Sequence, residues 1–362
     1  MDRRQFFYSS ASSLLGAYAL TACSSFIGKP KAKNVKLLIA TERDKRTSLI
    51  TIYDMQDGSG YDFVLPLGLP HSTLMSPQFP ESIFFFEVFG SAIRYNLRTG
   101  EMVTMKAGMD LPFWFNGHAV ESHDGKTIWC TERLTGAPGN LVRARDAESL
   151  ELLPGKENAY AGGHQVIRLP GTNILVSHPD KTINYFDTEK RQVIKEVSSP
   201  YKIVHLTHLS GSEMVGLGTL PFSKDEFAKT NDKNVREQMM NQHFIVDTEA
   251  PVIYSNLQGG LKTIFDESQH QLFRYNYGID HIGPGSFLTS HVRSNTVILW
   301  ENFQIKHTFS VISPLNVIHN RYRNSFYVAS GGKLIEYSLV DYKELKAYSF
   351  PKSVLMMATM KI

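Results

Sequence analysis

The chain has 362 residues, of which 42% are hydrophobic and 20% charged, so it can bury a core and does not resemble a disordered protein. Its 38 Lys and Arg residues nearly balance 35 Asp and Glu residues, which excludes the basic excess of a nucleic-acid-binding protein. The length exceeds that of a usual single domain, but closed all-β folds reach it because each added unit extends one core.

The N-terminal segment predicts export. Arg3 and Arg4 form a twin arginine directly before an uncharged stretch that ends in Leu-Thr-Ala-Cys at Cys23. This run resembles the lipobox of bacterial lipoproteins, in which the cysteine is diacylated and becomes the new N-terminus. We expect a signal peptide over residues 1–22 and a lipidated tether over residues 23–34. An ordinary thiol at Cys23 is the alternative.

The same segment predicts where the protein resides. Ser24, directly after the cysteine, resembles the residue found in lipoproteins sorted to the outer membrane. We therefore expect a periplasmic protein, held at the outer membrane through its lipid anchor only.

From Val35 onward, short β-type runs alternate with Gly, Pro, Asn and Asp, and this pattern predicts an all-β body over 35–362. The runs recur with a period of roughly 40 to 50 residues, which is typical of propeller blades. Each repeat opens with a histidine, passes a turn and continues into two apolar strands. The opening histidines are His71, His118, His164, His205, His281 and His319.

One further repeat is split between the two ends of the chain. Leu37–Thr41 and Ser48–Tyr53 lack an opening strand, and Ser353–Met360 supplies one, which removes exposed sheet edges. The sequence thus predicts an all-β, seven-bladed β-propeller closed by joining N- and C-terminal strands in one blade, with six or eight blades as alternatives. Near 221–247 the period breaks, and a capping box at Ser223 predicts a partly helical insertion.

The chain lacks the phosphate-binding loop, the His-Glu-x-x-His motif and the Gly-x-Ser-x-Gly elbow. What remains is the histidine series, because residues at the start of each innermost strand converge on the channel of a propeller. Neutral imidazole binds iron, copper and zinc, so we predict a transition-metal or ligand site at the six histidines. The alternative is a structural Gly-His turn, as at Gly117-His118 and Gly163-His164.

Other polar residues at strand ends are weaker candidates for the channel lining, and solvated strand ends are the alternative explanation. These residues are Glu42, Glu87, Glu132, His178 and His291. Cys130 lies in an apolar run and is expected to be a buried, inert thiol.

Several motifs resemble those of an uncharacterised bacterial propeller family, domain of unknown function 1513. The run Gly117–Ile128 with Thr131-Glu132 carries the resemblance, and Gly163–Gln165 and Val204–Leu206 match later repeats. The resemblance implies a periplasmic propeller encoded near iron-uptake proteins, which would be its partners, and it transfers no catalytic residue. The chain departs from the family pattern in its lipobox and in its last third.

Three functions follow from these patterns. The first is an exported, lipid-anchored propeller that binds a metal ion, small ligand or partner protein in iron acquisition. The second is a metal-dependent enzyme of lactonase or oxidoreductase type, and the third is a structural interaction scaffold.

Overall fold

The computed structural model describes residues 35–54, 59–68, 70–108, 110–136, 139–153, 160–179, 181–219, 252–264, 272, 276–320 and 323–361. The twin arginine, Cys23, the tether and the insertion predicted near 221–247 lie outside these residues. A search of the described residues finds no helix with the length and hydropathy needed to cross a membrane.

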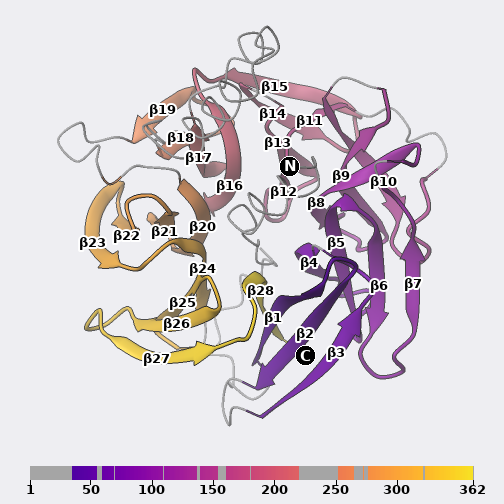
Figure 1. The fold of residues 1–362 in the computed structure, drawn as a ribbon. Helices are drawn as coiled ribbons and strands as arrows, with labels where there is room; N and C mark the ends of the chain where they lie inside the picture. Colours follow the sequence, from indigo (N-terminus) through magenta and orange to yellow (C-terminus); the bar gives the residue numbers. More distant parts are fainter. Residues whose placement is uncertain are drawn as a thin grey trace, which may run out of the picture.

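The described residues form antiparallel β-strands and no α-helix, which confirms the all-β prediction. Five sheets have four strands each, and an eight-stranded sheet combines two such units, β4–β7 and β8–β11. The units are arranged around a common centre, with one strand of each nearest the centre and another at the rim (Figure 1). This arrangement is that of a propeller.

Strand bounds follow the same order in every unit. The innermost strands are β28 (Val354–Lys361), β4 (Pro70–Met75), β8 (Phe113–Glu121), β12 (Val166–Arg168), β16 (Lys202–Ser210), β20 (Asn276–Gly283) and β24 (Pro314–Asn320). The second strands are β1 (Val35–Asp44), β5 (Ser82–Gly90), β9 (Thr127–Leu134), β13 (Ile174–Ser177), β17 (Glu213–Thr219), β21 (Ser286–His291) and β25 (Ser325–Ser330). The third strands are β2 (Thr47–Asp54), β6 (Ala92–Asn96), β10 (Asn140–Asp146), β14 (Thr182–Asp187), β18 (Val252–Ser255), β22 (Thr296–Glu301) and β26 (Lys333–Ser338). The outer strands are β3 (Gly60–Leu65), β7 (Met102–Met105), β11 (Tyr160–Gly162), β15 (Gln192–Ser198), β19 (Leu261–Ile264), β23 (Gln304–Ser310) and β27 (Glu344–Ser349).

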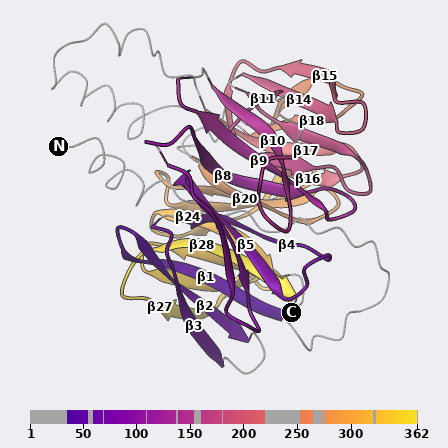
Figure 2. The ribbon, with the colours of Figure 1, turned by 90° about the vertical axis from the view of Figure 1, so that its right-hand side faces the viewer.

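The two ends of the described chain share one sheet, because β28 pairs with β1 from Val35↔Lys361 to Thr41↔Val354. The two strands lie side by side in Figures 1 and 2. This is the pairing predicted for Ser353–Met360. It places β28 at the inner edge of the sheet, so β1 has a partner on each side.

The core lies between neighbouring units, and the two-residue period of the strands fills both interfaces of each sheet. On β1, Leu38 and Ala40 pack against Ile83 of the next unit, whereas Leu37 and Ile39 pack in a cluster with residues of β24, β25 and β26. Each fully buried Leu or Ile contributes about 1.5–3 kcal/mol.

The innermost strands share an irregularity near their first residues. A β-bulge lies between Pro70 and Ser72 on β4, between Phe115 and Ala119 on β8, and between Ile203 and His205 on β16. Comparable bulges occur on β20, β24 and β28. Because a bulge adds an unpaired residue and redirects side chains, these positions set what points toward the centre.

Candidate metal centre

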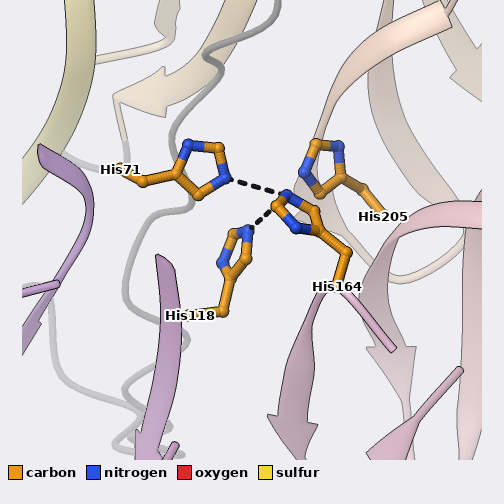
Figure 3. A group of neighbouring side chains, drawn as sticks. All are labelled: His71, His118, His164 and His205. Atoms are coloured by element: carbon orange, nitrogen blue, oxygen red, sulfur yellow. Dashed lines mark hydrogen bonds between the residues drawn. The ribbon is translucent and has the colours of Figure 1, made fainter. Parts of the chain in front are cut away.

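Four of the six predicted histidines come together. His71 lies on β4, His118 on β8 and His205 on β16, and His164 directly precedes β12. One ring nitrogen of each lies within 4.8 Å of the corresponding atom of every other, and Figure 3 shows the four rings converging. Four consecutive innermost strands therefore supply one histidine each. No other group of three or more His, Cys, Asp or Glu with metal-site spacing is found among the described residues.

The contacts between these rings suit a cation better than protons. His164 Nε2 lies 2.9 Å from His71 Nε2 and 3.3 Å from His118 Nε2 (Figure 3). A ring nitrogen carries either one N–H or one lone pair, so His164 Nε2 can make one good hydrogen bond and not two. Metal–nitrogen bonds of about 2.0–2.1 Å place ligand nitrogens roughly 3.3 to 4.2 Å apart, depending on coordination geometry. The observed separations bracket that range.

The tautomer of His205 is set by its neighbour. Its Nδ1 lies 2.7 Å from the carbonyl oxygen of Tyr277 on β20, and because a carbonyl only accepts, Nδ1 carries the proton. The neutral ring then has its lone pair on Nε2. A ligand histidine that donates its other N–H to a backbone carbonyl is the usual arrangement in metal sites.

Burial keeps the four rings neutral. Desolvation lowers the pKa of His71 to about 3, with a further contribution from His205, and it lowers the pKa of His205 to about 4. Desolvation and then neighbouring histidines hold the pKa of His118 and of His164 well below the ordinary value. Neutral imidazole is the form that binds metal, so the group is ready to bind at neutral pH.

Two glycines allow the backbone to come this close. Gly117 has φ of +90°, and a Cβ there would lie 2.5 Å from Cδ2 of His71. A Cβ on Gly163 would lie 2.1 Å from the carbonyl oxygen of His178. The Gly-His dipeptides thus have a structural role, and the same packing brings the imidazoles together.

The segment that carries His164 is held from several sides. Thr131 Oγ1 lies 3.1 Å from the carbonyl oxygens of both His118 and His164. Gln165 Oε1 accepts a bond from the Leu206 amide at 2.6 Å, which ties this segment to β16. Asn116 and Asn140 also donate to the Gly163 carbonyl, at 3.4 Å and 3.2 Å. No spacing in the sequence identifies these supporting residues, because their partners are backbone atoms of distant strands.

His178 belongs to the same support. Its Nε2 accepts a hydrogen bond from the Gln165 amide at 3.2 Å, and desolvation, followed by the effect of His205, lowers its pKa to about 3. It therefore lies behind His164 and outside the group of four.

His281 and His319 lie on β20 and β24 but do not join the group. The bulge of β20 lies between Asn276 and Ile279, so Gly278 rather than His281 is near the position that leads to the centre. Asn316 occupies the corresponding place on β24, directly after the bulge. Both displaced histidines donate their backbone amides to the buried carboxylate of Asp280, at 2.9 Å and 2.7 Å.

The remaining predicted lining residues are spread over the second strands. Glu132 on β9 is fully buried and pairs with Arg143 and Arg145. Glu87 on β5 accepts bonds from the backbone amides of Gly68 and Ser91, at 2.8 Å and 3.1 Å.

Two more residues complete that set. Glu42 lies near the end of β1 and is half-buried. His291 on β21 is buried, its Nε2 lies 2.8 Å from Thr289 Oγ1, and desolvation lowers its pKa to about 3. None of these residues belongs to the group of four.

No protein-family model matches the chain, and no curated protein matches it. Among solved structures, it is similar to hydrazine synthase of Kuenenia stuttgartiensis (TM-score 0.59, 12% identity, 91% of this chain and 99% of that chain covered). It is also similar to U3-55K (TM-score 0.57, 11% identity, 88% and 89% covered) and to the dihydro-heme d1 dehydrogenase NirN in complex with DHE (TM-score 0.55, 12% identity, 95% and 78% covered). Identities this low show a shared fold alone.

Proposed function

We propose that the chain binds one transition-metal ion, iron, copper or zinc, through His71, His118, His164 and His205. The convergence of one imidazole from each of four consecutive innermost strands carries this proposal. Imidazole suits these metals, and a set of four nitrogen ligands without a carboxylate does not suit magnesium or calcium.

The proposal includes the blade count and the closed ring. We count seven blades, with the two halves of the eight-stranded sheet as two of them. The buried clusters support this count, because each holds side chains from two neighbouring four-strand units and one of them joins the last unit to the first. A closed ring would hold the four histidines at fixed separations.

The biological setting that we propose rests on the N-terminal motifs. Arg3, Arg4 and Cys23 support export and lipidation, and the resemblance to domain of unknown function 1513 supports a periplasmic role beside iron-uptake proteins. In that setting the chain would bind or hand on metal at the outer membrane.

Metal content tests the central claim. The chain purified with its export signal should hold about one equivalent of metal by elemental analysis, or take it up on reconstitution, and His164→Ala should lose it because His164 contacts two other ligands. His281→Ala and His319→Ala are matched controls on innermost strands and should retain the metal.

The other outcomes separate the alternatives. A folded chain that binds no metal, with His164→Ala equally stable, would favour the scaffold function and contradict our proposal. Metal lost equally from His281→Ala would place the site elsewhere. A metal-dependent hydrolytic or redox activity that disappears with His164→Ala would assign the enzymatic function to the same centre.

A further inference from the structure

We infer that the metal centre takes a small anion as an additional ligand, on the side that faces β20 and β24. This inference rests on the proposed metal site. It concerns what the bound metal recognises, rather than whether metal is bound.

Charge balance is the first reason. The group contains four histidines and, among the described residues, no carboxylate or thiolate. Ligand imidazoles are neutral, so a divalent ion would keep its full double charge. His71, His118 and His205 are at most 2% exposed, and an uncompensated charge in such surroundings is costly. An anion bound to the metal offsets that cost.

The distribution of ligands around the ring is the second reason. The four histidines come from β4, β8, the residue pair before β12, and β16, which lie consecutively around the centre (Figure 1). On β20 and β24, the positions near the bulges hold Gly278 and Asn316 instead of histidine. Four nitrogens do not fill an octahedral or tetragonal coordination sphere, so the remaining positions point away from the histidine side.

A nearby cation and solvent access are the third reason. Lys202, at the start of β16, is exposed and acts electrostatically on both His164 and His178. His164 is half-buried, whereas the other three ligands are buried. An anion that reaches the metal past His164 would therefore be attracted by the Lys202 ammonium as well.

Azide is a suitable probe, because it is a small anion whose bond to copper produces a charge-transfer absorption band. The purified chain is loaded with Cu(II), the copper content is measured, and azide is titrated while absorption and electron paramagnetic resonance spectra are recorded. We expect a saturable change with one azide per copper. His164→Ala, which should hold no copper, should show no such change.

Lys202→Met tests the role of the cation, and Lys262→Met on the outer strand β19 of the same sheet is the matched control. Lys202→Met should raise the azide dissociation constant by about three- to tenfold at low salt, and less at high salt. Lys262→Met should leave the constant unchanged.

The failures of the two proposals are distinguishable. Copper bound at one equivalent with spectra that azide does not alter would overturn the anion inference and leave the metal site standing. A chain that binds no copper, iron or zinc would overturn the proposed function itself. Equal effects of Lys202→Met and Lys262→Met would remove Lys202 from the inference.

Discussion

Thr131 shows at the residue scale how the fold could support a metal site with groups that do not bind metal. It lies on β9, is fully buried, and its hydroxyl is placed between the backbone carbonyls of His118 and His164. One hydroxyl proton shared between these carbonyls links two strands that each carry a proposed ligand. Supporting residues of this kind commonly affect metal affinity about 10- to 100-fold.

We predict that Thr131→Val raises the metal dissociation constant by about tenfold or more, because the valine keeps the shape and removes the hydrogen bond. Thr131→Ser restores the hydroxyl and should recover most of the affinity. Competition with a chelator of known affinity measures both constants. Thr127→Val, on the same strand and also buried, is the control.

A purely structural role for Thr131 gives a different result. In that case Thr131→Val would lower the unfolding midpoint but leave the metal affinity and the copper spectrum of the folded protein unchanged. That outcome would contradict the positioning role.

At the scale of the elements, strands β9 and β10 are joined by a buried ion pair. Arg145 contacts the Glu132 carboxylate through Nε at 2.5 Å and through Nη2 at 3.0 Å, and Arg143 Nη1 lies 3.1 Å from the same group. The guanidinium of Arg145 also lies 4.5 Å from the ring centre of Phe113. Glu132 is thus accounted for by its arginine partners on the neighbouring strand.

We predict that Arg145→Met lowers the free energy of unfolding by about 3 kcal/mol, because Glu132 keeps its charge in a buried site with only Arg143 as partner. The double variant Glu132→Gln/Arg145→Met should recover much of that loss, since no unpaired charge remains. Urea unfolding measures both. Arg98→Met, which breaks an exposed pair with Glu81, should cost less than about 1 kcal/mol. Equal losses in the single and double variants would show that packing, not charge, is the cause.

At the scale of the whole molecule, the pairing of β28 with β1 joins the two ends of the described chain. Met357 on β28 is fully buried in a cluster that contains residues of β1, β24, β25 and β26. Stability of this junction depends on apolar contact as well as on backbone hydrogen bonds. Without it, β1 would be an edge strand able to pair with another chain.

We predict that Met357→Asp lowers the free energy of unfolding by about 4 kcal/mol and increases oligomer formation, because a carboxylate enters an apolar interface beside a newly exposed edge. Unfolding curves and size-exclusion chromatography measure the two effects. Ile312→Asp, at a site that is 78% exposed, should change stability by less than about 0.5 kcal/mol. A monomer of unchanged stability after Met357→Asp would show that the ring does not depend on this junction.

Much of the fold was predictable because the relevant signals are local and repeated. Alternating apolar residues such as Leu37 to Ala40 indicate a strand that is buried on both faces, and the regular recurrence of such strands indicates a propeller. The missing strand of the first unit also predicted the pairing of Ser353–Met360 with β1. Gly117-His118 and Gly163-His164 drew attention to two of the four proposed ligands.

The sequence by itself determined the all-β class, the pairing of its two ends and the set of histidines from which the site is built. Only the tertiary structure decided which of them meet: His71, His118, His164 and His205 converge, whereas His281 and His319 lie further along their strands and outside the group. The physical reason is that β-bulges set which side chain of each innermost strand reaches the centre, and a shift of one residue reverses the direction of a side chain. Bulges depend on pairing between strands, so the spacing of histidines along the chain does not reveal them.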